Sequence, residues 1–95
     1  MLRISNETYT IYDEVMDGFT LSVTHLNIQQ STRGHKHSHE EVYYFVGGMG
    51  MVEVGDSVLT AYPGKTLRIP SNVFHRVCND GLMPMTFICG WKNET

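Results

Sequence analysis

The chain has few cysteines and no long apolar run, and each absence excludes a class of protein. Cys78 and Cys89 are the only two cysteines, too few for a disulfide scaffold and wrongly spaced for a zinc ribbon, so both are expected to be reduced core thiols. No segment approaches the ~18 apolar residues of a membrane span, and residues 1–6 lack the apolar core of a secretory signal. The sequence therefore predicts a cytoplasmic protein with no membrane partner.

A clustered positive charge is also missing. Seven Lys and Arg residues stand against ten Asp and Glu residues, which gives a net charge of -3, and no run of like charges occurs. Proteins that bind nucleic acid carry a basic patch or stripe, so nucleic acid is not an expected partner. The shares of hydrophobic residues, 41%, and of charged residues, 18%, are those of a globular domain rather than of a disordered chain.

The 95 residues predict a single domain, 1–95, because two cores of half that size would each be too small to be stable. Helical periodicity is not sustained in any window of about 11 residues, whereas short β-rich runs recur along the chain. Strands are expected at 9–15, 19–28, 41–46, 50–54, 58–62, 66–69, 73–77 and 85–91. A change of phase near Thr24 and His25 predicts a β-bulge in the second run. So many short strands predict an all-β barrel or sandwich.

One predicted strand is apolar on both of its faces. Val42, Tyr44 and Val46 alternate with Tyr43 and Phe45, so one set can line the interior while the other is left outside. The outer set then needs a cover. A homodimer partner is the simplest cover, and a flanking strand of the same chain is the alternative.

Four of the five histidines lie in or beside two short segments, 34–41 and 70–75. Residues two apart on an extended strand point to the same side with Cα atoms roughly 6.6 Å apart, so His35 and His37 can converge on one ion. Four residues of extended chain cover about 13 Å, so Glu41 joins them only if residues 38–40 turn. His75 arrives from a distant strand after a Pro-Ser-Asn turn. A buried carboxylate costs several kcal/mol unless it is paired, which favours a metal site here.

These residues resemble the two sequence motifs of the cupin family. The first motif is matched by His35, His37, Glu41 and Gly48, and the second by Gly64, Pro70, His75 and Asn79, with Asn72 at its second glycine. Asn72 tolerates the left-handed backbone that such a glycine often supplies, so the turn should be kept. The first motif usually opens with a glycine where Gln29 stands. The resemblance implies a cupin-type jelly-roll barrel, a double-stranded β-helix, with the metal ligands His35, His37, Glu41 and His75.

Other residues near the motifs are candidates for roles in the same site. His39, on the expected turn, would suit general acid or base catalysis, and Tyr43, on the same side of its strand as Glu41, is a candidate for catalysis and for substrate binding. Arg68 is a candidate for binding an anionic substrate, provided that Leu67 and Ile69 do not face inward. Arg33 and Arg76 are candidates for the rim. A register that pairs His37 with His39 and uses Glu40 departs from the family spacing, and His25 is placed outside the site.

Three imidazoles and one carboxylate suit one divalent transition metal, Fe, Mn, Ni or Zn. In an octahedral ion two positions stay open, and a hydroxy-carbonyl compound chelated there could lose an α-proton. The resemblance to small single-domain cupins therefore implies an isomerase, epimerase or lyase acting on a sugar or sugar-phosphate-like metabolite. One alternative is a cupin dioxygenase that uses Fe(II) and O2. The other is a non-catalytic module that binds a small metabolite.

Overall fold

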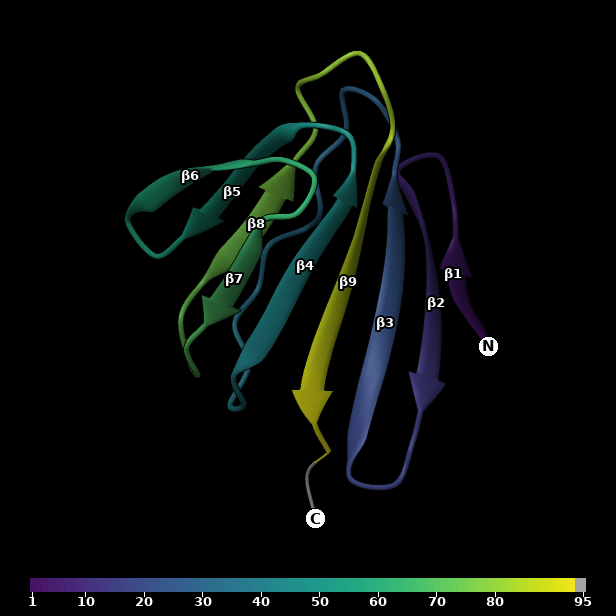
Figure 1. Ribbon diagram of the computed structural model, residues 1–95, viewed down its shortest axis with the longest axis vertical. Helices are drawn as coiled ribbons and strands as arrows, with labels where there is room; N and C mark the ends of the chain where they lie inside the picture. The colour runs from purple at the N-terminus through teal and green to yellow at the C-terminus, as the bar shows by residue number, and fades with distance from the viewer. Residues whose placement is uncertain (94–95) are drawn as a thin grey trace.

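The computed structural model describes residues 1–93, and these residues form strands and connecting turns without a helix. The strands are β1 (Leu2–Ser5), β2 (Tyr9–Val15), β3 (Phe19–Leu26), β4 (Glu41–Gly47), β5 (Gly50–Val54), β6 (Ser57–Ala61), β7 (Thr66–Ile69), β8 (His75–Cys78) and β9 (Met85–Lys92). They form a six-stranded sheet of order β1-β2-β3-β9-β4-β7 and a three-stranded sheet of order β6-β5-β8 (Figure 1). The all-β prediction is confirmed. Within residues 1–93 no helix is long and apolar enough to cross a membrane.

Most strands lie where the sequence predicts them, and β2, β5 and β7 have the predicted bounds. The strand β1 is not predicted, because its four residues are all exposed and carry no burial pattern. It pairs with β2 at the edge of the large sheet, and its register shifts between Leu2 and Ile4, so that Arg3 is the extra residue of a β-bulge. The predicted strand 73–77 begins two residues early, since β8 begins at His75.

The β-bulge predicted near Thr24 and His25 is wrong. Strand β3 pairs with β2 and with β9 in continuous register along its whole length. The polar side chains of Thr20, Ser22 and Thr24 are buried, while Phe19 and Leu21 are exposed on the outer face of the sheet. Every second residue from Thr20 to Leu26 therefore faces the interior, without a change of phase. The apparent change arises because the inward residues are polar up to Thr24 and apolar at Leu26.

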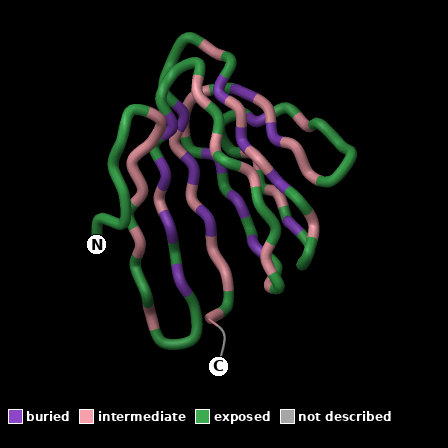
Figure 2. Tube along the Cα trace, turned by 180° about the vertical axis from the view of Figure 1, so that it is seen from behind, coloured by how far each residue is buried: buried purple, intermediate pink, exposed green. Residues whose placement is uncertain are grey.

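The interior changes from apolar to polar along the strands of the large sheet. At one end Leu26 opposes Met85, and Phe45 opposes Phe87; all four side chains are buried in the hydrophobic core. At the other end the interior rows across β3, β9 and β4 are Ser22, Cys89 and Tyr43, then Thr20, Trp91 and Glu41. Buried positions run along the inner strands, and exposed positions follow the loops and the N-terminal edge (Figure 2). The core thus stabilises one end of the barrel and leaves at the other a cavity lined by polar, aromatic and aliphatic side chains.

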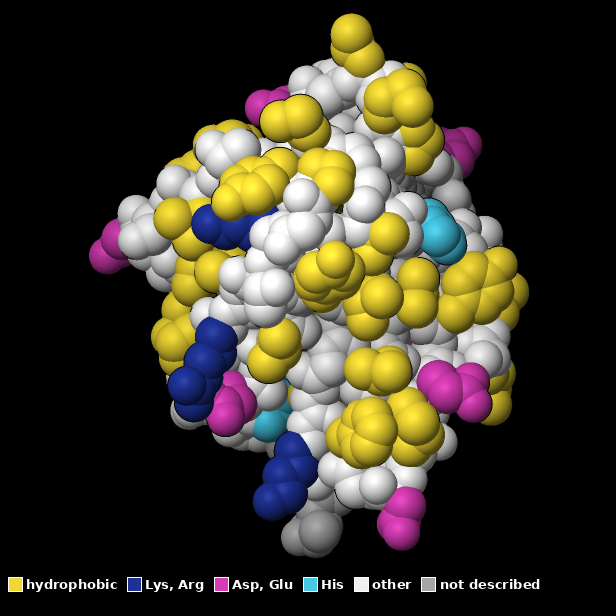
Figure 3. Space-filling view, viewed as in Figure 1, with side chains coloured by type: hydrophobic (Ala, Val, Ile, Leu, Met, Phe, Trp, Pro, Cys, Tyr) yellow, Lys and Arg dark blue, Asp and Glu magenta, His cyan; other side chains and the backbone are white. Residues whose placement is uncertain are grey.

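The outer face of the large sheet is apolar at its centre. Val42, Tyr44 and Val46 are each close to half exposed on β4, and Leu21 lies beside them on β3, over the position of Gly90. Figure 3 shows apolar side chains gathered over the middle of this face. The pattern of β4 agrees with the prediction that one of its apolar faces lies outside the barrel.

Candidate metal centre

His35 and His75 are brought together by the backbone of two segments that are distant in sequence. The loop that follows β3 runs antiparallel to β8, where Thr32 N–H donates to Val77 O at 2.9 Å. Further along, His35 and His75 form an isolated antiparallel bridge, with N–H to O distances of 3.1 Å and 2.9 Å. Residues directly opposite each other on antiparallel strands project to the same face. The two imidazoles therefore share one side of the small sheet, with ring centroids 4.7 Å apart.

Glu41 reaches the same place because the chain bends before β4 begins. Ser38 and His39 form the bend, as the sequence predicts, and Glu41 is the first residue of β4. A separate turn, at residues 70–72, precedes His75. Asn72 stabilises it, because its φ of 61° is left-handed and its N–H donates to His37 O at 2.6 Å. Asn72 thus keeps the turn, as the sequence predicts. Gln29 is also left-handed, with a φ of 59°, at the position where the family motif has a glycine.

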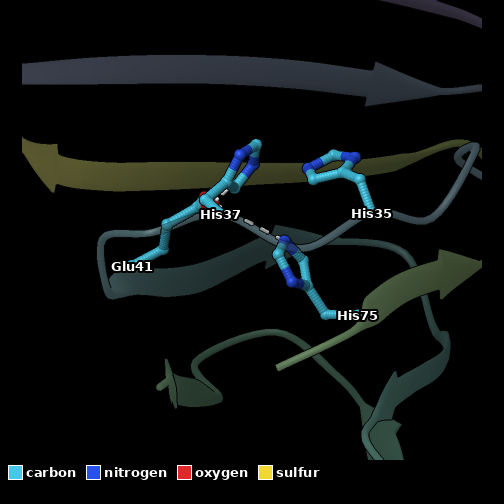
Figure 4. Close-up of side chains that lie close together, drawn as sticks. All are labelled: His35, His37, Glu41 and His75. Atoms are coloured by element: carbon cyan, nitrogen blue, oxygen red, sulfur yellow. Dashed lines mark ion pairs between the residues drawn. The ribbon is translucent and has the colours of Figure 1, made fainter. Parts of the chain in front are cut away.

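The four predicted ligands point toward one another (Figure 4). Oε1 of Glu41 lies 3.0 Å from Nε2 of His37 and 3.5 Å from Nε2 of His75. The ring centroids of His35 and His37 are 4.2 Å apart. One donor atom from each of the four residues lies within 4.8 Å of the other three. Glu41 and His75 are buried, whereas His35 is exposed and His37 is half-buried, so the cluster has one closed and one open side.

The donor set fits a divalent metal ion. Oε1 of Glu41 and Nε2 of His75 are both buried, and neither has a hydrogen-bond partner among the described residues. Buried polar atoms are nearly always paired, so two such atoms 3.5 Å apart favour a shared cation. Nδ1 of His75 lies 3.1 Å from Val73 O, and a carbonyl only accepts, so Nδ1 carries the proton and Nε2 keeps its lone pair for a metal.

The spacing of the donors is close to that of a metal site. Two ligands bonded to one ion at about 2.1 Å are at most about 4.2 Å apart. The donor atoms lie within 4.8 Å of one another, which exceeds this limit by about 0.6 Å at most. Three imidazole nitrogens and one carboxylate oxygen are donors that Fe(II), Mn(II), Ni(II) and Zn(II) accept.

Mutual interactions shift the pKa values of the four groups. Burial lowers the pKa of His35 and of His37, and the neighbouring histidines lower that of His35 further. Burial opposes ionisation of Glu41, but the histidines around it outweigh burial and hold its pKa below the usual value. Burial also lowers the pKa of His75, yet the Glu41 carboxylate and the Val73 carbonyl outweigh it, so the net shift is upward. Glu41 therefore remains a carboxylate at neutral pH.

The two predicted catalytic residues both line the cavity above this cluster. His39 stacks between His37, with centroids 4.9 Å apart, and Trp91, at 5.8 Å, which fixes the plane of its ring. Its Nε2 lies 4.0 Å from Oε1 of Glu41. Tyr43 is buried, and burial together with Cys89 raises its pKa well above 10. Tyr43 is therefore a neutral phenol that can donate a hydrogen bond.

The predicted substrate-binding residue Arg68 lies away from this cavity. Leu67 and Ile69 face inward, so Arg68 projects outward from β7, where Nε and Nη2 donate to Oε2 of Glu40 at 2.9 Å and 2.7 Å. This position does not support the predicted contact with substrate. Arg76 is likewise held by Glu53, with hydrogen bonds of 3.0 Å and 2.9 Å. Arg33, in contrast, lines the cavity.

The cavity has a volume of about 310 Å³, and several of its lining residues are not predicted from the sequence. They are Arg3, Ser22, Thr24, Thr32 and Trp91. Ser22 and Thr24 alternate with apolar residues that face outward, so the alternation itself could have identified them. The usual assumption that the apolar side of a strand faces inward places these two hydroxyl residues on the outside instead. Nothing local marks Arg3, whose strand is short and exposed.

An all-β barrel with three histidines and a glutamate converging at one end defines the chain as a small barrel protein with a candidate metal site. Residues 22–91 match the family model described as the cupin domain, and the chain belongs to this family. The fold and the family that the sequence predicts are thus confirmed.

Three known proteins illustrate the likeness. The uncharacterized protein MJ1618 of Methanocaldococcus jannaschii is 32% identical over 56 residues, 58% of this chain and 45% of that protein, so the match spans less than half of the relative. An RmlC-like cupin from Shewanella frigidimarina has a TM-score of 0.86 at 15% identity, with 99% of this chain and 84% of that chain covered. A predicted oxalate decarboxylase from Thermotoga maritima has a TM-score of 0.83 at 17% identity, with 90% and 81% covered. The structures of the Shewanella and Thermotoga proteins thus share the fold of this chain.

Proposed function

We propose that this cupin is a metal-dependent isomerase, epimerase or lyase that acts on a small hydroxy-carbonyl compound. The proposed metal ligands are His35, His37, Glu41 and His75. The observation that carries the proposal is the convergence of buried Oε1 of Glu41 and Nε2 of His75 from segments distant in sequence: the two atoms lie 3.5 Å apart, and neither makes a hydrogen bond among the described residues. Without a cation this arrangement buries a carboxylate at a cost of several kcal/mol.

The open side of the cluster is where substrate would bind. A divalent ion held by His35, His37, Glu41 and His75 would supply a positive charge that stabilises negative charge developing on the oxygens of a hydroxy-carbonyl compound. The cavity of about 310 Å³ above it suits a small metabolite rather than a polymer. Hydroxyl groups of Ser22, Thr24 and Thr32 line its wall beside apolar and aromatic side chains, so the cavity offers a small number of polar contacts to a substrate.

His39 and Tyr43 are proposed to move the proton. His39 accepts a proton from the carbon beside the carbonyl group, and the electron pair of the broken C–H bond becomes a C=C bond with negative charge on the carbonyl oxygen. Tyr43, held neutral by its raised pKa, donates a hydrogen bond to that oxygen. Protonation of the same carbon from its other face, by a donor on that side, would give epimerisation. Return of the proton from His39 to the former carbonyl carbon, with the hydroxyl proton passing to the former carbonyl oxygen, would give isomerisation. The steps need no oxidant or reductant.

A lyase outcome has separate support. One similar structure is that of a predicted oxalate decarboxylase, and decarboxylation is a lyase reaction on a small anion. This likeness, at 17% identity, adds decarboxylation to the candidate reactions.

The proposal is tested first by metal analysis of protein purified without chelators. We expect about one equivalent of Fe, Mn, Ni or Zn per chain. His75→Gln should lose the metal while keeping the β-sheet circular dichroism signal, whereas His25→Ala should retain it, since His25 lies on the outer face and contacts Thr86. Parent protein that binds no divalent metal after reloading, or a His75→Gln variant that binds it as tightly as the parent, would refute the proposal.

The reaction is tested with the metal restored. Deuterium incorporation into a panel of hydroxy-aldehydes, hydroxy-ketones and sugar phosphates, in deuterated water without oxygen, would support proton transfer at carbon. Oxygen consumption by the iron-loaded protein with the same panel would instead identify a dioxygenase. Tight binding with neither turnover would identify a binding module.

A further inference from the structure

An arginine that the proposed reaction does not use lies in the same cavity. Arg3 is the extra residue of the β-bulge in β1, and bulges commonly re-aim a side chain. The side chain crosses the inner side of the sheet from its edge, because Nε lies 2.9 Å from Oδ2 of Asp13 on β2 and Nη2 donates to Oγ of Ser22 on β3 at 3.3 Å. It lines the cavity together with the metal cluster.

The contacts of Arg3 leave part of its guanidinium available. A guanidinium has five N–H donors, and Asp13 and Ser22 account for two of them. Asp13 binds through one oxygen only, since its Oδ1 is buried and has no hydrogen-bond partner among the described residues. The side chain of Arg3 is 50% exposed. Asp13 therefore orients the group without enclosing it, and the remaining N–H groups can bind a carboxylate or phosphate.

The charges lining the cavity favour an anion, although the chain as a whole has a net charge of -3. Arg3 and Arg33 both line the cavity, and Glu41 is the only carboxylate among the described lining residues. Glu41 is one of the proposed metal ligands, and Asp13 offsets part of the charge of Arg3 from behind, so Arg33 and the remaining N–H groups of Arg3 supply the positive character that faces the cavity. A substrate that carries a negative charge would thus meet a complementary site.

The sheet register sets the distance between Arg3 and the proposed proton-transfer groups. Ser22 on β3 opposes Cys89 on β9, which opposes Tyr43 on β4. Neighbouring strands are about 4.8 Å apart, so Ser22 and Tyr43 are separated by about 10 Å at the backbone. The guanidinium of Arg3 lies beside Ser22, with Nη2 3.3 Å from its Oγ, so its separation from Tyr43 is of the same order. A compact molecule of roughly three to six carbons would span it.

We infer that the substrate carries an anionic group that Arg3 binds, at the opposite end from the hydroxy-carbonyl group held at the metal cluster. This inference rests on the proposed function and adds to it the charge and the length of the substrate. A carboxylate and a phosphate share the required chemistry, because both accept two parallel hydrogen bonds from a guanidinium.

The test compares ligands that differ only in the distal charge. Malate and 2-hydroxybutyrate share a hydroxy-acid head and differ by a carboxylate in place of a methyl group, and glyceraldehyde 3-phosphate and glyceraldehyde differ by the phosphate. Binding to the Zn(II)-loaded protein is followed by the fluorescence of Trp91, the single tryptophan, which lines the cavity. We expect at least one pair to show a preference of about 10- to 100-fold for the anionic member.

Arg3→Gln should abolish that preference by weakening only the anionic ligand, and Arg3→Lys should restore part of it. Arg68→Gln is the matched control, because Arg68 is an exposed guanidinium outside the cavity, and it should change neither ligand. The pair that responds to Arg3 distinguishes a carboxylate from a phosphate substrate.

Equal affinity for both members of each pair, or a preference that survives Arg3→Gln, would overturn the inference. Zinc content, measured on the same samples, separates this failure from that of the proposed function. If the protein retains zinc but Arg3 has no effect on binding, the inference about Arg3 is wrong and the proposed metal site is unaffected. If the parent protein binds no zinc, both the proposed function and the inference are wrong. Circular dichroism confirms that each variant is folded.

Discussion

His35 and His75 lie opposite each other and exchange both of their backbone hydrogen bonds, although they are 40 positions apart in the chain. This pairing positions two imidazoles through the backbone rather than through side-chain packing. The backbone positions of these two proposed ligands are therefore set before any ion binds. A site organised in this way should bind metal without refolding the barrel.

We accordingly expect the metal to be removable without unfolding. Treatment with a chelator should leave the far-ultraviolet circular dichroism spectrum unchanged, because the core at the opposite end of the barrel, around Phe45 and Phe87, does not depend on the site. The midpoint of thermal unfolding should fall, since a ligand that binds only the folded state adds to its stability. A chelated protein that loses its sheet signal at 25 °C would contradict this expectation.

Metal affinity should fall as the pH is lowered. Imidazoles bind metal in the neutral form, and the pKa of His75 in the metal-free protein is raised, so His75 is the first of the three histidines to take up a competing proton. Its protonation weakens binding by up to about tenfold per pH unit below that pKa. His35 and His37, whose pKa values are lowered, compete only at lower pH. Metal titrations between about pH 8 and pH 5.5 measure this, and an affinity constant over that range would be inconsistent with histidine ligands.

His39 should affect turnover without affecting metal content. Loss of a general acid or base typically lowers the rate by about 10²- to 10⁴-fold. We expect His39→Gln to reduce deuterium incorporation into substrate by that amount and to keep the metal of the parent protein. The control is Tyr62→Phe, on an exposed side chain outside the cavity lining. Unchanged exchange in His39→Gln would move the proton-transfer role to another group.

The adjacent glycines 47 and 48 should respond very differently to alanine. Gly48 has a φ of 78°, and a Cβ there would lie 2.4 Å from Pro84 O. Gly48→Ala should destabilise the fold by about 3 kcal/mol, from left-handed backbone strain and from the clash with backbone atoms. A Cβ at Gly47 meets nothing within 4 Å, so Gly47→Ala should stay within about 1 kcal/mol of the parent. Urea unfolding of both variants measures the difference, which a similar stability of the two would disprove.

The homodimer predicted from the sequence stays a prediction, and the outer face of the large sheet is the surface that we propose for it. The centre of this face, around Val42 and Tyr44, is apolar and uncharged. In a two-fold interface each patch faces its own copy, so an uncharged centre avoids placing like charges together. Tyr44→Glu should shift the sedimentation mass from dimer to monomer, whereas Tyr62→Glu should not. A parent protein that is monomeric at micromolar concentration would remove the proposal.

Several features of this protein follow from its sequence alone. Strand positions depend on local alternation and on turn residues, so β2, β5 and β7 were predicted to the residue. The spacing of His35, His37 and Glu41, with a bend between them, is also local, and the structure has this bend and brings the three side chains together. Asn72 adopts the left-handed turn that its residue type allows.

Tertiary structure decided which side of each strand faces the interior. Alternation specifies two faces but not which of them is inside, and this protein buries hydroxyl groups on β3 and exposes its apolar residues. The same uncertainty of phase applied to Arg68, which lies outside. Arg3 enters the cavity through a bulge and a pairing with β2 that no short-range signal marks. Local patterns therefore determined the strands and the proposed metal ligands, while the charge and the walls of the cavity depended on contacts between residues far apart in the chain.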